Sequence, residues 1–319
     1  MPTLRYLHLD VFTDRALEGN QLAVFPEPQG LTADAMQAIA REMAFSESTF
    51  IFPPERGGDV RMRIFTPGEE LPMAGHPTVG SAFALAAEGR IDRSRAEFVF
   101  ELGIGPTPVA LEWKDGALDF AWMTQPLPAF GARVTDRAAF AAAIGVEPRD
   151  LVADLPIEVV SCGNPFLFAP LVTRDAVDRV SINPPAFAAC CRAAGAETHG
   201  LFIFSLDRAN AAGDETVYSR MLAQGLGIAE DPATGSASGP LGAYLAAHHV
   251  LAPERTAQFV SLQGVRMRRP SRIHISIAQE HGRITRVRVG GRSVLVGRGM
   301  LEVSSVLLSR LNAAHLPPA

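Results

Sequence analysis

Two glycine-rich segments carry the polar residues best suited to binding a small acid. The first, MAGHPTVGSA, places His76 after Gly75, and the second, DPATGSASG, places Asp231 and Ser236 around Gly235. Each segment precedes a run of small apolar residues, so each is expected to begin a helix. The free N–H groups and the positive dipole at a helix start attract an anion, and two such starts facing one cleft would hold a carboxylate without a cation.

Glu47 is the candidate for proton transfer. It lies in FSESTF, between an amphipathic segment and an apolar one, where a carboxylate is out of place unless it is solvated or paired. Burial favours the protonated form of a carboxyl group, so a buried Glu47 would both take and give a proton near neutral pH. General acid–base catalysis of this kind contributes roughly 10² to 10⁴ in rate.

Each of these residues also has an ordinary structural interpretation. Glu47 is compatible with an exposed loop, and His76, which precedes Pro77, with a local cap or a hydrogen-bonded structural histidine. Asp231 is compatible with a turn, and Ser236 with an N-cap. The binding-site hypothesis therefore depends on the two segments acting together, since neither carries it alone.

Other chemistries are disfavoured by the residues that they would need. Cys162, Cys190 and Cys191 form no C-x-x-C pair, so neither a zinc site nor a disulfide framework is indicated. The single lysine, Lys114, lies in the turn sequence WKDG, which is poorly placed for a pyridoxal Schiff base. GIGPTP and GLGIAE lack the third glycine of a dinucleotide loop, H-E-x-x-H is absent, and GSASG has Ala237 where a nucleophilic serine would stand. The residues therefore disfavour a pyridoxal enzyme, a dinucleotide site, a catalytic metal and a serine hydrolase.

Composition places the chain among ordinary globular proteins. It has 319 residues, of which 47% are hydrophobic and 20% charged, and this length is typical of two domains. The formal net charge is −5 and no basic block occurs, so neither nucleic acid nor a membrane surface is an expected partner. The first residues lack the apolar core of a signal peptide, and the sparse cysteines fit a reducing compartment, so we expect a cytoplasmic protein.

The pattern of elements predicts a mixed α/β (α+β) fold. Strands are expected at residues 3–12, 60–65 and 96–102, and a helix capped by Thr32 at residues 32–45.

In the second half, TDRAAFAAAIG predicts a helix with Thr135 as its cap and Gly145 as its stop, and Gly290 and Gly291 predict a hairpin turn. The uncharged residues 235–253 are too small and too polar for a membrane span, and they suit a helix buried in a domain.

The two halves of the sequence resemble each other at a separation of 160 residues. Placing Ala74 against Thr234 pairs Gly75 with Gly235, and STFIF and RMRIF correspond to GLFIF and YSRML. This order predicts two copies of one unit, each wrapping strands around a buried helix whose small residues permit close approach. Chance similarity between two alanine-rich helices is the alternative.

The best candidate for a joint between the halves is TQPLPAFGARV, residues 124–134, which holds two prolines and a glycine. We therefore expect an N-terminal domain of residues 1–124 and a C-terminal domain of residues 125–298. Residues 299–319 are expected to pack back on the first domain, and within them SSVLLSRLNAAHLPPA, residues 304–319, predicts a helix up to His315.

Motifs along nearly the whole chain resemble those of the PhzF-like phenazine-biosynthesis isomerase family, which has the diaminopimelate epimerase fold. They are LDVFTDRALEGNQLAVF, FSEST, ELPMAGHPTVGSA, EDPATGSASGPLGAYL and VGGRSVLVGRG. The resemblance implies two pseudo-symmetric domains, each a strongly curved, mostly antiparallel sheet around a central helix. It also implies a cleft between them, a homodimer, a small carboxylic-acid substrate and no cofactor.

The resemblance also assigns roles to the candidate residues. In the phenazine enzyme a glutamate of the SES-type motif moves a proton on trans-2,3-dihydro-3-hydroxyanthranilic acid, and Glu47 corresponds to it. The family's substrate-binding histidine, aspartate and serine correspond to His76, Asp231 and Ser236, with main-chain amides near Gly75, Gly235 and Ser236 receiving the carboxylate.

Related epimerases and proline racemases place a thiol on each side of the substrate carbon, because inversion removes a proton from one face and returns it to the other. The matching positions here are Ala74 and Thr234. A single carboxylate can move a proton between two carbons on one face, so we expect a cofactor-independent isomerase of a small unsaturated or amino carboxylic acid. The alternatives are an epimerase or racemase of a small amino or hydroxy acid, and a binding protein of the same fold without catalysis.

Overall fold

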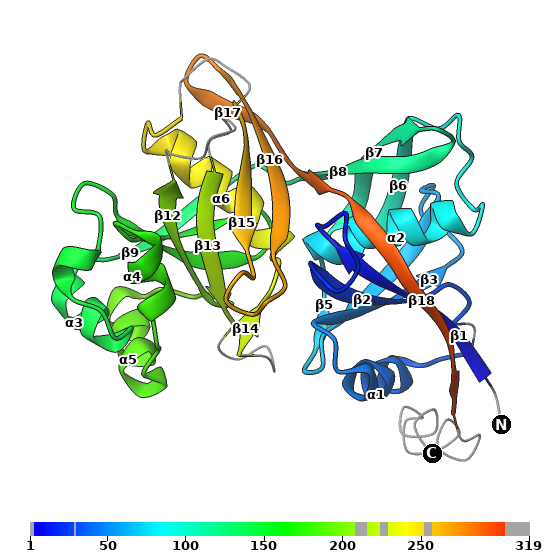
Figure 1. Cartoon of the computed structure of the whole chain (residues 1–319), viewed down its shortest axis with the longest axis horizontal. Helices are drawn as coiled ribbons and strands as arrows, with labels where there is room; N and C mark the ends of the chain where they lie inside the picture. Colours follow the sequence, from blue (N-terminus) through cyan, green and yellow to red (C-terminus); the bar gives the residue numbers. More distant parts are fainter. Residues whose placement is uncertain (1–2, 29, 208–215, 224–228, 252–256, 304–319) are drawn as a thin grey trace. The chain divides into compact units, whose positions relative to one another are not determined.

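The computed structural model describes residues 3–28, 30–207, 216–223, 229–251 and 257–303. It divides the chain into two compact units, whose elements are labelled in Figure 1. The first unit takes its described residues from Met1–Met123 and Gly291–Ala319, and the second from Thr124–Gly290.

The first unit is a mostly antiparallel sheet with two helices. The helices are α1 (Ala33–Met43) and α2 (Gly75–Ala87), and the strands are β1 (Thr3–Val11), β2 (Asn20–Phe25), β3 (Glu47–Phe52), β4 (Val60–Phe65), β5 (Glu70–Leu71), β6 (Glu97–Leu102), β7 (Gly105–Lys114), β8 (Ala117–Gln125) and β18 (Ser293–Glu302). The strands pair in the order β18–β1–β2–β3–β4–β6–β7–β8, with β5 also on β4. Only β2 with β3 and β4 with β6 are parallel among these pairs of the described residues.

The second unit repeats this architecture and adds helices. Its strands are β9 (Ala129–Val134), β10 (Ile157–Ser161), β11 (Pro165–Pro170), β12 (Leu201–Asp207), β13 (Thr216–Leu222), β14 (Glu230–Asp231), β15 (Ala257–Gln263), β16 (Ser271–Glu280) and β17 (Arg283–Gly291). Its helices are α3 (Arg137–Ala143), α4 (Arg174–Arg179), α5 (Pro184–Ala194) and α6 (Gly235–Ala247), with a short 3-10 helix at Pro148–Asp150. The order β9–β10–β11–β12–β13–β15–β16–β17, with β14 on β13 and parallel pairs at β11 with β12 and β13 with β15, matches the first unit strand for strand.

The internal repeat predicted from the sequence is therefore a structural one. Helices α2 and α6, and the short strands β5 and β14, begin and end 160 residues apart. The aligned arginines of RMRIF and YSRML make the same interaction. Arg63 donates from Nε and Nη2 to the Glu70 carboxylate, and Arg220 donates from the same two atoms to the Glu230 carboxylate. Each pair joins the short strand to its neighbour shortly before the central helix begins.

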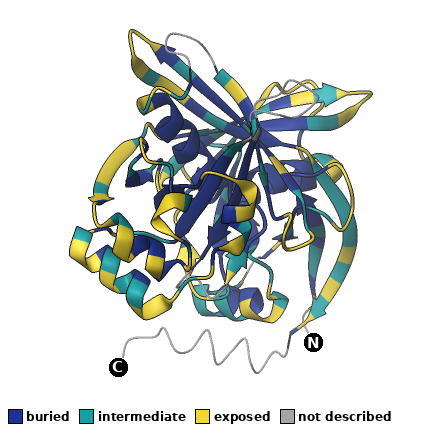
Figure 2. Ribbon diagram, turned by 60° about the vertical axis from the view of Figure 1, so that its left-hand side comes forward, coloured by how far each residue is buried: buried dark blue, intermediate teal, exposed yellow. Residues whose placement is uncertain are grey.

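Both central helices are buried on nearly every side, as their small apolar residues predict. Residues 75–85 of α2 and 235–246 of α6 are all buried, and Figure 2 shows how burial continues along the strands around them. Glycines permit this contact: a Cβ on Gly80 would lie 2.6 Å from Leu22 Cδ2, and one on Gly242 would lie 2.7 Å from Ile275 Cγ2. The prediction that small residues admit the strands is confirmed, and so is the α+β fold class.

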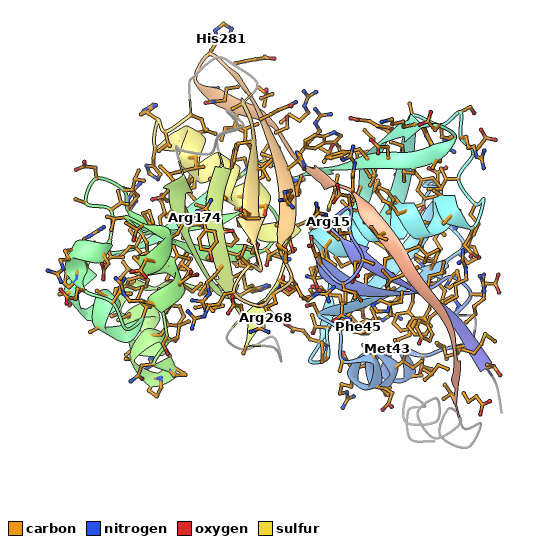
Figure 3. The ribbon with its side chains drawn as sticks, viewed as in Figure 1. Arg15, Met43, Phe45, Arg174, Arg268 and His281 are labelled. Carbon is orange, nitrogen blue, oxygen red and sulfur yellow. The ribbon has the colours of Figure 1, made fainter. Side chains whose placement is uncertain are left out.

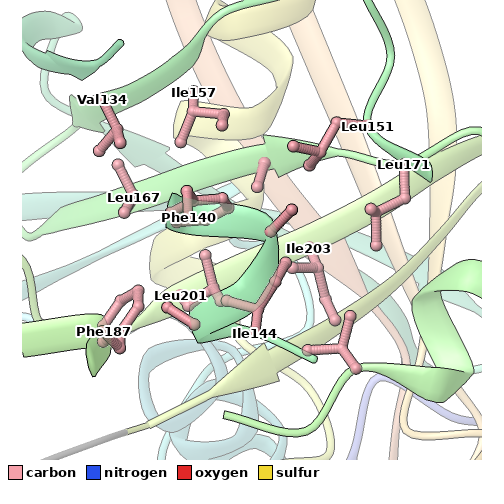
Figure 4. Packing of buried hydrophobic residues seen from close by; sticks show 14 of the residues in the cluster. Val134, Phe140, Ile144, Leu151, Ile157, Leu167, Leu171, Phe187, Leu201 and Ile203 are labelled. Carbon is pink, nitrogen blue, oxygen red and sulfur yellow. The ribbon is translucent and has the colours of Figure 1, made fainter. Parts of the chain in front are cut away.

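A further apolar cluster of the second unit lies under α3 and α5. Phe140, Ile144 and Phe187 pack there against Leu167 and Leu201 from the sheet (Figure 4). This cluster shares no residue with the cluster that surrounds α6. The added helices are therefore held by a second hydrophobic core.

Two local expectations are wrong, the cap of α3 and the turn at Gly290 and Gly291. The N-cap of α3 is Asp136, whose Oδ1 accepts from the Ala139 amide, because the helix begins one residue later than the Thr135 cap requires. The proposed joint, residues 124–134, begins where the second unit begins, and it contains β9, which pairs with β10; that it joins two domains stays a prediction. Gly290 and Gly291 form no hairpin turn, since both lie within β17.

The chain returns to the first unit at Gly291, before residue 298, where the second domain was expected to end. β18 begins at Ser293 and pairs with β1 along its length, from Ser293 opposite Val11 to Glu302 opposite Thr3. The assignment of the two units as independent domains stays a prediction, and the helix expected up to His315 lies outside the described residues. Across the described parts of the chain, no helix combines the length and the apolar character that a membrane span requires.

Candidate functional site

The start of α2 is a helix end without a side-chain cap. Its N-cap is Ala74, which is in an extended conformation. The alanine methyl group cannot accept a hydrogen bond from the first N–H groups of the helix. The Thr78 hydroxyl donates to the Ala74 carbonyl over 2.7 Å and so leaves those groups untouched. The main-chain donors of this first turn are therefore available to an anion, and no side chain competes for the positive end of the helix dipole.

Glu47 reaches this helix start from β3. It is the first residue of the strand, paired in parallel register with Leu22, and α1 ends shortly before it at the left-handed Ala44. Phe45, labelled beside α1 in Figure 3, stacks on His8 with 4.7 Å between ring centroids and fixes the connecting segment. Glu47 is thus held by elements on both sides of it.

The structure brings Glu47 and His76 together. Glu47 Oε2 lies 3.3 Å from His76 Nε2, and the side chains are 13% and 2% exposed. This contact contradicts the exposed-loop interpretation of Glu47. Two of the residues selected from the sequence therefore form one polar pair beside an uncapped helix start.

His76 is neutral in this environment. Burial lowers its pKa from 6.5 to about 3, and a backbone hydrogen bond with Gln21 offsets this only in part. Asn20 Nδ2 lies 3.2 Å from His76 Nδ1, so the asparagine contacts the inner edge of the imidazole ring. The facing atoms, His76 Nε2 and Glu47 Oε2, are both buried, and the neutral ring places no positive charge beside Glu47.

Asn20 was not selected from the sequence as a site residue. It is buried at the start of β2, 56 positions from His76 in the chain. The motif LEGNQLAVF could have indicated Asn20, because it places an asparagine beside an apolar strand. A buried asparagine there needs a polar partner.

The second unit holds Asp231 in a buried hydrogen-bond network. The Thr234 hydroxyl donates to Asp231 Oδ2 over 2.5 Å and accepts from Gln263 Nε2 over 3.0 Å. Gln263 Nε2 also lies 2.7 Å from the Asp231 carbonyl, and Gln263 Oε1 accepts from the Thr234 amide over 3.1 Å. Asp231 is therefore fixed in side chain and backbone, and Gln263, on β15, is a second residue that the sequence did not indicate.

Ser236 and Gly235 lie in the first turn of α6. The N-cap is Thr234, so the interpretation of Ser236 as an N-cap is wrong. Thr234 makes no capping bond, because its hydroxyl is directed to Asp231. The α6 start, like that of α2, offers main-chain donors that no side chain occupies.

The candidate residues thus fall into two sets, one in each unit. Glu47, His76 and Gly75 lie at the start of α2, and Asp231, Ser236 and Gly235 lie at the start of α6. That the two sets face one cleft stays a prediction.

No cysteine stands in either set. Cys162 is buried, and burial raises the pKa of its thiol to about 12, so it is a poor source of thiolate. Cys190 and Cys191 lie on α5. The positions at which two-thiol enzymes need a thiol are the N-caps Ala74 and Thr234. In the part of the chain that the structure describes, no group of three histidine, cysteine, aspartate or glutamate residues is placed to hold a metal ion.

Comparison with known proteins gives a family match over nearly the whole chain. Residues 9–299 match the family PhzC-PhzF, described as phenazine biosynthesis-like protein. The trans-2,3-dihydro-3-hydroxyanthranilate isomerase of Pseudomonas aeruginosa is 36% identical over 301 residues, covering 92% of this chain and 98% of the relative. The enzyme of the same name from Pseudomonas fluorescens is 36% identical over 296 residues, covering 93% and 98%.

Solved structures agree. A PhzF-family phenazine biosynthesis protein of Bacillus anthracis matches with a TM-score of 0.85 and 27% identity, covering 95% of this chain and 100% of that one. A predicted epimerase of Pseudomonas aeruginosa matches with a TM-score of 0.78 and 35% identity, covering 94% and 100%. A hydroxyproline epimerase of Agrobacterium vitis, at 14% identity, a TM-score of 0.63 and coverage of 94% and 92%, shares the fold.

Proposed function

The chain belongs to the PhzC-PhzF family of phenazine biosynthesis-like proteins, and we propose that it moves a proton within a small unsaturated carboxylic acid by means of Glu47. It is an isomerase, like the relatives that it matches over nearly their full length. The contact of Glu47 Oε2 with the neutral, buried His76, at 3.3 Å and beside the uncapped start of α2, is the observation that carries the proposed mechanism.

The reaction begins with Glu47 ionised. The neutral His76 ring lies 3.3 Å from its carboxylate, and Asn20 contacts that ring at Nδ1. The carboxylate removes a carbon-bound proton, and the electron pair of the broken C–H bond enters the conjugated system of the substrate. Protonated Glu47 then delivers the same proton to another carbon on the same face, so a double bond shifts and no net charge changes.

The main chain supplies the anion site. We propose that the substrate carboxylate binds the N–H groups around Gly75, and those around Gly235 and Ser236, while Asp231 holds a polar group of the ring. A helix start contributes only about 0.3 to 2 kcal/mol to binding an anion, so orientation of the acid is its larger contribution.

The relatives' name supplies the first substrate to test. Trans-2,3-dihydro-3-hydroxyanthranilate carries a carboxylate, an amino group and a hydroxyl group on an unsaturated ring, and this combination fits an anion site with a nearby carboxylate and hydroxyl groups. We propose this compound or an acid of the same class as the substrate.

We further propose that the enzyme is a cytoplasmic homodimer that needs neither metal nor coenzyme. Support comes from the family resemblance and from a proton path that uses only Glu47, with no thiol or Schiff-base lysine. Sedimentation of the purified chain tests the oligomeric state, and dialysis against a chelator, which we expect to leave turnover unchanged, tests the need for a metal.

Incubation in deuterated water, followed by NMR, tests the proposed reaction. Trans-2,3-dihydro-3-hydroxyanthranilate and a panel of small unsaturated and amino acids are each added to the full chain. A shifted double bond supports the isomerase. No change in any acid of the panel would count against catalysis and leave the binding-protein alternative.

One observation favours an epimerase as the second candidate, namely the 35% identity to a solved protein described as a predicted epimerase. Against it, the two positions of the required thiols are Ala74 and Thr234, and the Thr234 hydroxyl is directed to Asp231. Deuterium entering one carbon with inversion and no shifted bond would establish the epimerase.

A further inference from the structure

The two repeats differ at the hairpin that follows the first strand after the central helix. In the first unit β6 ends at Leu102 and β7 begins at Gly105, so two residues suffice to close the hairpin. In the second unit β15 ends at Gln263 and β16 begins at Ser271. The longer connection contains the sequence VRMRR at residues 265–269, which we name the basic turn. Because the short version closes the same sheet, closure alone does not require the basic turn.

The base of the basic turn lies against the α6 half of the candidate site. Gln263, which immediately precedes it, hydrogen-bonds Asp231 and Thr234. A Cβ on Gly264 would lie only 2.5 Å from the Pro232 carbonyl oxygen, so the turn packs directly on the backbone after Asp231. Gly103 makes the corresponding contact with Pro72 in the first unit, where no basic residues follow.

The backbone of the basic turn holds one arginine in a costly conformation. The amides of Arg268 and Arg269 bond to the carbonyls of Val265 and Gly264, the pattern of a helix end in which the left-handed position is normally glycine. That position is Arg268, at φ 59°. A non-glycine residue is less stable than glycine in this conformation, so replacing Arg268 with glycine is expected to stabilise the turn.

Residues 265–268 of the basic turn are exposed, and Arg269 is half-buried. Arg266 is anchored to the Asp178 carbonyl, whereas Arg268 makes no hydrogen bond or ion pair with any residue that the structure describes. Figure 3 shows Arg268 at the opposite end of β16 from His281, on the side of β14. Two carboxylates of the same unit have other partners, since Glu230 accepts from Arg220 and Asp178 accepts from Tyr218.

We infer that Arg268 is a specificity residue that selects negatively charged substrates for the α6 half of the site. A cation on a turn whose base packs against a site attracts anions over about 10 Å at 0.1 M salt, and it discriminates against neutral compounds of the same shape. The exposed Val265 and Met267 beside it, at 39% and 36%, offer apolar contact to the rest of an organic acid. This inference rests on the proposed function, because it names the charge of the same substrate.

Three variants of the full chain distinguish an effect of the Arg268 charge on binding from an effect on folding. Arg268→Glu reverses the charge, and Arg268→Gly removes it and relieves the backbone. Arg286→Glu is the matched control, because Arg286 is exposed on β17 opposite Ala278. Seven residues of strand, roughly 23 Å, separate Ala278 from the end of the basic turn at Ser271, beyond the Debye length at 0.1 M salt.

Binding of anthranilate and of its neutral amide, anthranilamide, is measured by calorimetry at low and high salt. We expect the Kd of anthranilate at 50 mM salt to rise about three- to tenfold in Arg268→Glu, the effect to shrink at 500 mM, and anthranilamide to be unaffected. Arg268→Gly should weaken anthranilate while its Tm rises by about 2 °C, which shows that the loss is not unfolding.

The outcomes distinguish this inference from the proposed function. Wild-type binding of anthranilate that depends on Arg268, without turnover of any acid, would support the inference and reject the proposed reaction. Equal Kd values in Arg268→Glu, Arg268→Gly and Arg286→Glu would overturn the inference even if turnover is found. A change in sedimentation with unchanged affinity would assign the basic turn to contact between copies and also overturn it.

Discussion

Thr234 donates its hydroxyl proton to Asp231 across 2.5 Å, at the position where a two-thiol enzyme of this fold needs a cysteine. The same hydroxyl accepts from Gln263 Nε2, so both of its hydrogen-bonding functions serve the buried network. A group committed in this way fixes a neighbouring carboxylate and is a poor acid or base toward a substrate. This relationship supports the proposed one-base chemistry over two-base inversion.

Thr234→Val removes the hydroxyl and keeps the shape of the side chain, so it measures the effect of the hydroxyl alone. Valine leaves Gln263 Nε2 and Asp231 Oδ2 each short of a partner, so we expect the free energy of unfolding to fall by about 1–3 kcal/mol. We also expect KM to rise, because the carboxylate is no longer fixed. Thr234→Ser, which keeps the hydroxyl, is the control for both urea denaturation and kinetics. Equal behaviour of the valine and serine variants would show that the hydroxyl does not hold Asp231.

Glu47→Gln should abolish proton transfer and spare binding. Glutamine keeps the size of the side chain but is no base, so we expect kcat to fall by at least about 100-fold with less than about a threefold change in the Kd of a substrate analogue. Glu42→Gln, at an exposed position on α1 close in the sequence, is the matched control and should retain activity. A glutamine variant as active as this control would remove Glu47 from the mechanism.

The folded protein should lose stability in mild acid because of His76. The unfolded chain takes up a proton at this histidine near pH 6.5, whereas the folded chain does so only near a pKa of about 3. Between these values the unfolded state binds more protons, so His76 alone lowers the free energy of unfolding by about 1.4 kcal/mol per unit as the pH falls. Urea titrations at pH 7, 6, 5 and 4 measure this slope.

His76→Gln should give a shallower loss of stability over the same pH range, because glutamine does not titrate. His281→Gln, at an exposed position labelled in Figure 3, is the control and should follow the wild-type slope. Parallel slopes for all three proteins would mean that His76 is readily protonated in the folded state, and its assignment as neutral would then be wrong.

Two glycines with the same backbone conformation should respond differently to alanine. Gly264 and Gly282 have φ of 74° and 72°, but a Cβ on Gly264 would lie 2.4 Å from the Arg269 carbonyl oxygen, whereas one on Gly282 would meet nothing within 4 Å. Gly282→Ala should cost only the conformational penalty, about 1–2 kcal/mol. Gly264→Ala should cost more, because the backbone must also move.

Measured unfolding free energies of the two variants therefore report whether the basic turn is packed on the Asp231 segment. We also expect Gly264→Ala to raise KM and Gly282→Ala to leave it unchanged. Similar losses of stability in both variants would contradict the close packing of Gly264 on Pro232.

The sequence by itself determined the repeat, the two buried helices and the types of residue at the site. Runs of small apolar residues can only be buried, and the correspondence between Gly75 and Gly235 is a property of the chain order. The same reasoning selected Glu47 and His76 from separate motifs, because an isolated glutamate before an apolar strand and a histidine at a helix start each require a partner.

Only the tertiary structure decided which partners these residues have. Asn20 contacts His76 Nδ1, and Gln263 holds Asp231. These contacts join residues far apart in the sequence, and a hydrogen bond depends on where two groups meet in space and on what else competes for them. Local pattern indicates that a buried polar group must be satisfied, and only the folded chain specifies by which group.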